Sequence, residues 1–158
     1  MFFVSKIPVG KIGEALQSPQ YDKEYCMAEF LTEEWLNSFE EKLNTDSQYA
    51  KIAKNWEGDI NLKINPGEKL DEPVTAYFDL WHGKCRQAYF VQEGIEQEAA
   101  FAMKGKYEDY VRILTGDLHP MQAMLTRKLN VQGNMALLMR NVPTVLDFVR
   151  CAQEVTNI

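Results

Sequence analysis

The sequence predicts an α+β domain in which a five-stranded, mostly antiparallel sheet is covered on one face by helices. Near both ends of the chain, apolar residues recur at the spacing of a helix. In the middle they alternate with polar residues, which is typical of half-buried strands. The chain has 158 residues, enough for one hydrophobic core and too few for two domains of ordinary size. Helices, then strands, then helices indicate a helical layer packed on a sheet.

Residues 1–27 are the least regular part of the sequence, and we expect an N-terminal extension of uncertain order there. They lack the basic region followed by a long apolar run that a signal peptide needs. Phe2 and Phe3 suit a contact with a partner, so a homodimer formed through this arm is one hypothesis. The domain itself is predicted over residues 28–158.

Two helices are predicted before the strands. Thr32 is followed by two glutamates, as expected of an N-cap with acidic residues in the first turn, where the helix dipole favours them. Thr45 with Gln48 three residues later is a capping-box pattern for a second helix, which ends near Gly58. Each helix has one apolar stripe expected to face the core: Trp35, Leu36, Phe39 and Leu43 in the first, and Tyr49, Ile52, Ala53 and Trp56 in the second.

Four strands are predicted next, because apolar and polar residues alternate between turn-forming residues. Their ranges are 60–65, 74–80, 85–91 and 98–103. Strands that follow one another through short turns favour an antiparallel meander.

Helical spacing returns after the fourth strand. Gly116 and Pro120 mark the end of one helix and the start of the next. The predicted helices span 107–114, 120–125, 135–139 and 145–155, with a short fifth strand at 129–131.

Composition and charge exclude several classes of function. The net charge of −6 argues against nucleic acid as the main partner, because phosphate binding needs a basic face. Lysines and arginines are scattered, with no run that would hold an anionic bilayer. Cys26, Cys85 and Cys151 lie far apart, which fits neither a disulfide framework nor a metal site. No stretch approaches the roughly 20 apolar residues of a membrane span. We therefore expect a cytoplasmic protein with free thiols.

The sequence shows no catalytic constellation, so no enzyme, cofactor or metal is predicted. Nucleophile elbows, phosphate-binding loops and zinc-protease motifs are all missing. His82 lies in a turn and His119 precedes a proline at a helix start, where either suits a surface or capping role. An enzyme acting on a lipid-like substrate would have only Tyr107, Tyr110, His119 and Cys151 as candidate groups.

Methionine is concentrated in one part of the chain. Five of the seven methionines lie between Met103 and Met139. Methionine side chains are flexible and polarisable, so they line surfaces that adapt to apolar shapes. They also fill ordinary cores, and composition alone does not separate a pocket from a core.

The segment Leu114–Met139, which reads LTGDLHPMQAMLTRKLNVQGNMALLM, resembles the C-terminal signature of the sterol-carrier-protein-2 family. The sequence departs from that signature at Asp117, His119 and Arg127, the last standing where glycine is usual. Trp56-Glu57-Gly58 also resembles the family's junction between helix and first strand. The resemblance covers residues 28–142 and is most specific in its last third.

This resemblance implies a hydrophobic tunnel between sheet and helices that holds a fatty acid, acyl chain, phospholipid or sterol-like molecule. Transient membrane contact would accompany such a role, and the final helix would act as a lid. A non-catalytic interaction or regulatory module with the same fold is the alternative. The residues expected to line the tunnel are Phe78, Leu80, Phe101, Met103, Val111, Leu114, Met121, Met124, Leu125, Met135, Leu138, Met139 and Phe148.

Overall fold

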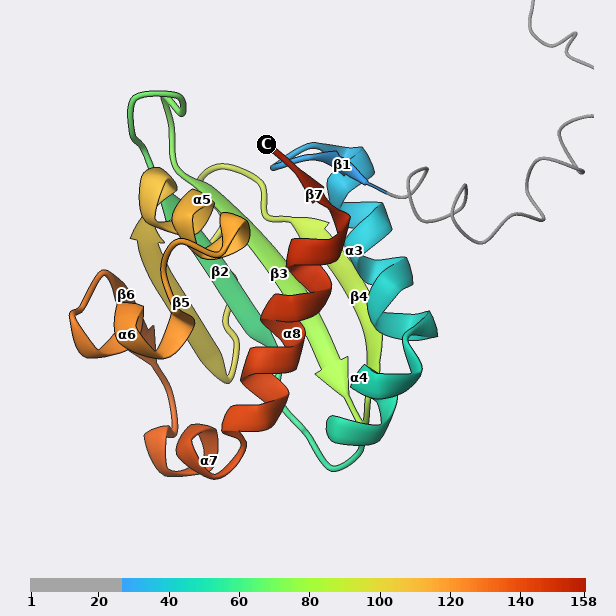
Figure 1. Ribbon diagram of the computed structural model, residues 1–158. Helices are drawn as coiled ribbons and strands as arrows, with labels where there is room; N and C mark the ends of the chain where they lie inside the picture. Colours follow the sequence, from blue (N-terminus) through green and yellow to red (C-terminus); the bar gives the residue numbers. More distant parts are fainter. Residues whose placement is uncertain (1–26) are drawn as a thin grey trace, which may run out of the picture.

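A computed structural model describes residues 27–158 of the chain (Figure 1). The predicted extension over residues 1–27, and any dimer contact made by Phe2 and Phe3, therefore lie outside the described residues, apart from Met27. The predicted α+β class is confirmed: helices α3, α5 and α8 lie over one face of a five-stranded sheet.

The described elements follow the expected order of helices, strands and helices. They are β1 (Ala28–Glu29), α3 (Glu33–Thr45), α4 (Ser47–Ile52), β2 (Ile60–Asn65), β3 (Val74–Trp81), β4 (Lys84–Phe90), β5 (Phe101–Lys106), α5 (Tyr107–Thr115), α6 (Pro120–Leu125), β6 (Leu129–Gln132), α7 (Met135–Arg140), α8 (Val142–Val155) and β7 (Thr156–Asn157).

The first two helices begin at side-chain caps. The Thr32 hydroxyl accepts the backbone N–H of Trp35 at 3.1 Å, as the sequence predicts. The capping box at Thr45 is wrong: the cap of α4 is Asp46, whose carboxylate accepts the N–H of Tyr49 at 2.8 Å. The Thr45 hydroxyl instead donates to the carbonyl of Glu41 within α3. A carboxylate next in sequence is the stronger acceptor for N–H groups at a helix start, which explains the difference.

The sheet is not a simple meander. Its strand order is β4-β3-β2-β5-β6, and β5 pairs in parallel with β2 while the other neighbours are antiparallel. The predicted meander is therefore wrong at its fourth strand, which crosses over through residues 91–100 to the far side of β2. The strand begins at Phe101 rather than at residue 98. Alternation of apolar residues identifies a strand but does not specify its neighbour.

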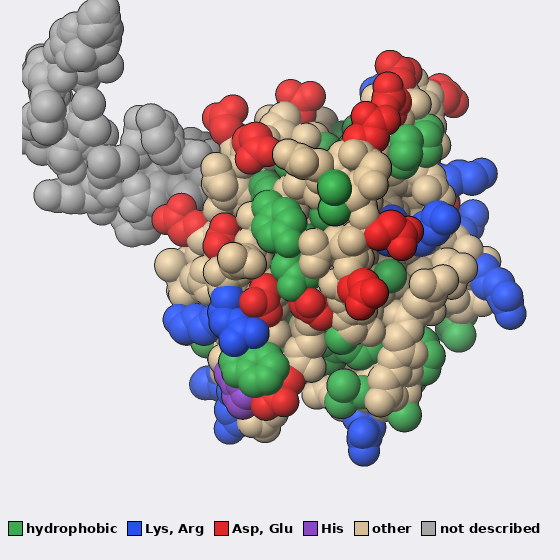
Figure 2. All heavy atoms as spheres, turned by 180° about the vertical axis from the view of Figure 1, so that it is seen from behind, with side chains coloured by type: hydrophobic (Ala, Val, Ile, Leu, Met, Phe, Trp, Pro, Cys, Tyr) green, Lys and Arg blue, Asp and Glu red, His purple; other side chains and the backbone are tan. Residues whose placement is uncertain are grey.

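Alternate residues of the central strands point to the helical layer and form the core. Ile60, Leu62 and Ile64 of β2 pair across the sheet with Phe78 and other residues of β3, and all four named residues are buried. The opposite sheet face has no helical cover in the described part of the chain (Figure 1) and displays charged side chains with some hydrophobic ones between them (Figure 2). On that face Tyr77 stacks on Tyr89.

A small second sheet fastens the end of α8. Strands β1 and β7 pair in parallel, and the Trp35 indole N–H donates to the Thr156 hydroxyl at 2.7 Å in a buried position. No helix among residues 27–158 is long and apolar enough to cross a membrane.

We expect Thr156→Val to destabilise the fold by about 2 kcal/mol, because the isosteric change leaves the buried Trp35 N–H without an acceptor. Urea unfolding followed by circular dichroism measures the change. Thr115→Val, which removes an exposed hydroxyl on α5, is the matched control and is expected to cost less than about 0.5 kcal/mol. Equal costs for the two variants would contradict the assigned role of the Trp35–Thr156 bond.

Candidate functional site

An apolar cavity of about 60 Å³ lies between the sheet and the helical layer. Strands β2, β3, β5 and β6 form its floor, and helices α3, α5, α6 and α8 form its roof. Among the described residues, no charged side chain lines it. The lining residues are Phe30, Trp35, Phe39, Trp56, Ile60, Leu62, Ile64, Leu80, Met103, Tyr110, Ile113, Leu114, Pro120, Met124, Leu129, Thr144, Val145, Phe148, Val149 and Ala152.

The few polar groups in the cavity wall already have partners. The Tyr110 hydroxyl donates to the Met103 carbonyl at 2.8 Å, and the Trp56 indole N–H donates to the Gly58 carbonyl at 2.9 Å. The Trp35 indole is held by Thr156, as described above. Burial raises the pKa of Tyr110 far above its ordinary value, so its phenol stays neutral. The cavity therefore suits a guest that needs no hydrogen bonds.

The wall of the cavity is least buried on α5, α6 and α8. Of the lining residues, Leu114, Met124 and Val149 are half-buried, one on each of these helices, whereas the others are buried. We call these three residues the mouth. They mark the side from which a guest would reach the interior.

The structure brings five of the thirteen residues expected from the sequence into the cavity wall: Leu80, Met103, Leu114, Met124 and Phe148. Three others are buried outside the wall; Phe78 packs on Phe39 and Phe148, Phe101 packs on Trp56, and Leu138 packs in the core. Val111 and Met121 are half-buried. Leu125, Met135 and Met139 are exposed, by 81%, 43% and 54%. None of these eight lines the cavity. Ligand contact stays a prediction for the five buried or half-buried residues, and we do not propose it for the three exposed ones.

Sequence reasoning missed most of the cavity wall. Ile60, Leu62 and Ile64 line it from β2, and Trp35 and Phe39 from α3. Their periodicity marked them as core residues, which they are. Whether a core residue borders a void depends on the spacing between layers, which one sequence does not specify.

The cavity is small for a lipid. Ligand pockets commonly have volumes of roughly 300–1,000 Å³, so about 60 Å³ accommodates only a short apolar group. A longer chain fits only if part of the roof moves away from the sheet.

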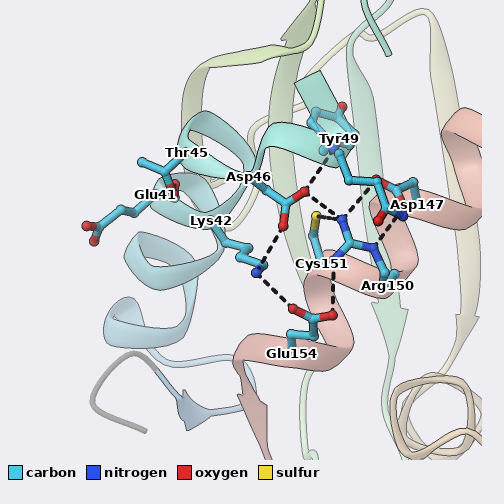
Figure 3. A network of polar contacts seen from close by, with 10 residues as sticks. Glu41, Lys42, Thr45, Asp46, Tyr49, Asp147, Arg150, Cys151 and Glu154 are labelled. Carbon is cyan, nitrogen blue, oxygen red and sulfur yellow. Dashed lines mark hydrogen bonds and ion pairs between the residues drawn. The ribbon is translucent and has the colours of Figure 1, made fainter. Parts of the chain in front are cut away.

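Helix α8 is fastened to the helices beside it by a network of partly buried charges (Figure 3). The Arg150 guanidinium donates to Asp46 at 2.7 Å, to Asp147 at 2.8 and 3.1 Å, and to Glu154 at 3.0 Å. Lys42 of α3 completes the network with contacts of 3.0 Å to Asp46 and 2.8 Å to Glu154. We call these five residues the α8 clasp. It holds the α3 and α4 side of α8, while Val149 of the same helix borders the mouth.

The α8 clasp is an ion-pair site rather than a metal site. Asp46, Asp147 and Cys151 place possible ligand atoms within 4.8 Å of one another. The Arg150 guanidinium already donates to both carboxylates, however, and supplies the positive charge that a metal would. Burial raises the pKa of the Cys151 thiol to about 12, so this thiol does not offer a thiolate.

The candidate catalytic groups either lie outside the cavity or already have hydrogen-bond partners. His82 is exposed and contacts Glu57 at 2.7 Å, and His119 accepts the N–H of Met121 at the start of α6. Neither Tyr107 nor Cys151 lines the cavity. Among residues 27–158, these candidates place no free nucleophile or base in the cavity wall.

The profile of the SCP-2 sterol transfer family matches residues 36–145. A search of curated proteins gave no match. A crystal structure of sterol carrier protein 2 is 33% identical, and the match covers 80% of this chain and 99% of that one with a TM-score of 0.74. A protein of Thermus thermophilus, named as a possible sterol carrier protein, is 32% identical over 82% of this chain and 92% of its own, with a TM-score of 0.73.

A more distant structure shows the same fold. Sterol carrier protein 2 of Yarrowia lipolytica, in its apo form, is 17% identical over 75% of this chain and 88% of its own, with a TM-score of 0.53. The profile match spans most of the chain, and the first two structures combine high coverage with about one identical residue in three. The chain belongs to the SCP-2 sterol transfer family.

Proposed function

We propose that this protein binds an apolar molecule in the cavity under α5, α6 and α8 and carries it between sites. The fatty acids, acyl chains, phospholipids and sterol-like molecules expected from the sequence are the candidate ligands. The observation that supports this proposal is a cavity whose described walls carry no charged side chain and whose indole and phenol groups are satisfied by the protein. Such a site gains free energy only from apolar surface, about 0.8 kcal/mol for each CH₂ group removed from water.

Loading requires the roof to open on the side of the mouth. The α8 clasp and the contacts of Phe148 with Phe39 and Phe78 hold α8 in place. Helix α5 ends at Gly116, whose φ of 90° lies in the left-handed region that glycine adopts without strain. The short α6 follows, and six residues are too few for an independently stable helix. We therefore assign the movement to α5 and α6, and not to α8, the helix that the sequence suggested as a lid.

The first test is the content of the purified protein. We expect denaturing extraction, followed by mass spectrometry, to release a near-stoichiometric apolar compound. A fluorescent fatty acid should bind at micromolar concentration and be displaced by unlabelled fatty acid. An empty extract together with no probe binding would contradict the proposal.

A second function is supported by the small volume of the cavity. A domain of the same fold that never opens would act as a non-catalytic interaction or regulatory module. The same extraction and probe titration separate the two, because only the carrier binds a guest.

We also propose a cytoplasmic location. Cys85 and Cys151 are free and buried in the described part of the chain, as is usual in a reducing compartment. Burial raises the pKa of both thiols to about 12, which protects them from oxidation.

A further inference from the structure

Four cations converge at the edge of the sheet beside α6. Lys104 and Lys106 of β5, with Arg127 and Lys128 of the turn between α6 and β6, line an open groove of about 440 Å³. We call these four residues the basic rim. Among the described residues, Asp109 is the only carboxylate that lines the groove, although the whole chain has a net charge of −6. A net positive groove on an acidic protein is complementary to an anionic partner.

The basic rim lies next to an exposed apolar side chain. Leu125, the last residue of α6, is 81% exposed and stands two residues before Arg127. No other large apolar side chain in residues 27–158 is as exposed. Met124, the residue before Leu125, belongs to the mouth of the cavity. A partner that contacts Leu125 and the basic rim would therefore lie beside the entrance.

Arg127 adopts a backbone conformation that its side chain does not favour. Its φ is 63°, in the left-handed region that glycine adopts without strain and that a residue with a Cβ atom, such as arginine, disfavours. The turn between α6 and β6 thus keeps a cation at a position where glycine would relieve the strain. Residues in such conformations are concentrated at functional sites.

We propose that Leu125 and the basic rim dock the protein on an anionic phospholipid bilayer. The lysines and arginine would meet lipid phosphates, while Leu125 enters the boundary between headgroups and acyl chains. A nucleic acid would offer Leu125 no apolar layer, so the exposed leucine favours the bilayer. The inference rests on the proposed function, because a carrier must meet the membrane at the mouth of its cavity.

Vesicle co-sedimentation of the full chain tests the docking surface. We expect binding to vesicles of phosphatidylcholine with phosphatidylglycerol, weakening as salt is added, and little binding to phosphatidylcholine alone. Arg127→Gly should weaken binding about fivefold, because the variant loses the attraction of one cation to the anionic surface. Its thermal stability should stay equal or rise. Leu125→Ser should weaken it about tenfold, since its apolar side chain no longer enters the bilayer.

Ile95→Ser is the matched control, because Ile95 is 58% exposed on the connection between β4 and β5 and does not line the groove of the basic rim. It should bind vesicles as the unchanged protein does. Equal binding to neutral and anionic vesicles, or equal losses for Ile95→Ser and Leu125→Ser, would overturn the docking surface. Probe binding without vesicles should be the same in all variants, so its failure in the unchanged protein contradicts the carrier function instead.

Discussion

Replacing Arg150 by methionine is expected to destabilise the protein by about 3 kcal/mol, because it leaves the buried Asp147 carboxylate without its cation. Asp147 has only 5% of its side chain exposed and accepts two hydrogen bonds from Arg150. Chemical unfolding followed by tryptophan fluorescence measures the loss. Gln48 also donates to Asp147, at 2.8 Å, but it supplies no charge.

Two further variants distinguish the effect of the unpaired buried carboxylate from the effect of breaking any ion pair. Arg150→Met combined with Asp147→Asn should recover part of the loss, because no unpaired carboxylate remains at that position. Arg86→Met breaks an exposed pair with Asp79 and should cost about 1 kcal/mol or less. If Arg150→Met costs no more than Arg86→Met, the α8 clasp does not hold the helix.

The α8 clasp also predicts how stability depends on pH. Burial alone would raise the pKa of Asp46, but hydrogen bonds from Arg150, Tyr49 and Lys42 outweigh it and lower the pKa well below 3.8. The pKa of Glu154 is also lowered from 4.5: burial opposes the shift, and the contacts with Lys42 and Arg150 outweigh it. A lowered folded-state pKa stabilises the fold above the unfolded-state value and stops doing so as the pH falls. The temperature midpoint of unfolding should therefore fall as the pH is lowered below about 4. It should fall less steeply in Arg150→Met.

Filling the mouth is expected to weaken ligand binding strongly while the protein stays folded. Val149→Trp places an indole at the mouth, beside Leu114 of α5 and Met124 of α6. Val149 is half-buried, so the extra volume of the indole can extend toward solvent. We expect the affinity for a fluorescent fatty acid to fall at least about thirtyfold, equivalent to 2 kcal/mol. Displacement titrations measure this change.

Leu146→Trp is the matched control for that experiment. Leu146 is also half-buried on α8 but does not line the cavity. Its affinity for the fatty acid should stay within about threefold of the original. Should both tryptophan variants bind the probe normally, the entrance would not lie between Leu114, Met124 and Val149.

The sequence predicted the elements better than their arrangement. The cap at Thr32, the alternation in β2 and the proline at the start of α6 each act within a few residues of chain, so local pattern was sufficient. The parallel pairing of β5 with β2 depends on contacts between distant segments, which alternation does not encode. The meander was therefore wrong although each of its strands exists.

The site was predictable only in part for a similar reason. Met103, Met124 and Phe148 line the cavity, while Leu125 and Met139 are exposed on the short helices α6 and α7. Six residues are too few for apolar spacing to specify which side of a helix faces the sheet. Scattered lysines and arginines showed no basic run, yet β5 and the turn before β6 bring four of them together. The contact between Arg150 and Asp46 also joins residues about a hundred positions apart. Sequence spacing reveals neither grouping.

The most direct test of the carrier function uses the methionines as internal reporters. With ¹³C-labelled methionine methyl groups, a fatty acid titration should shift or broaden the NMR signals of Met103 and Met124, which line the cavity. The signals of Met135 and Met139, exposed on α7, should stay in place. If Met103 and Met124 do not respond, or if only the exposed methionines do, the fatty acid does not enter the interior.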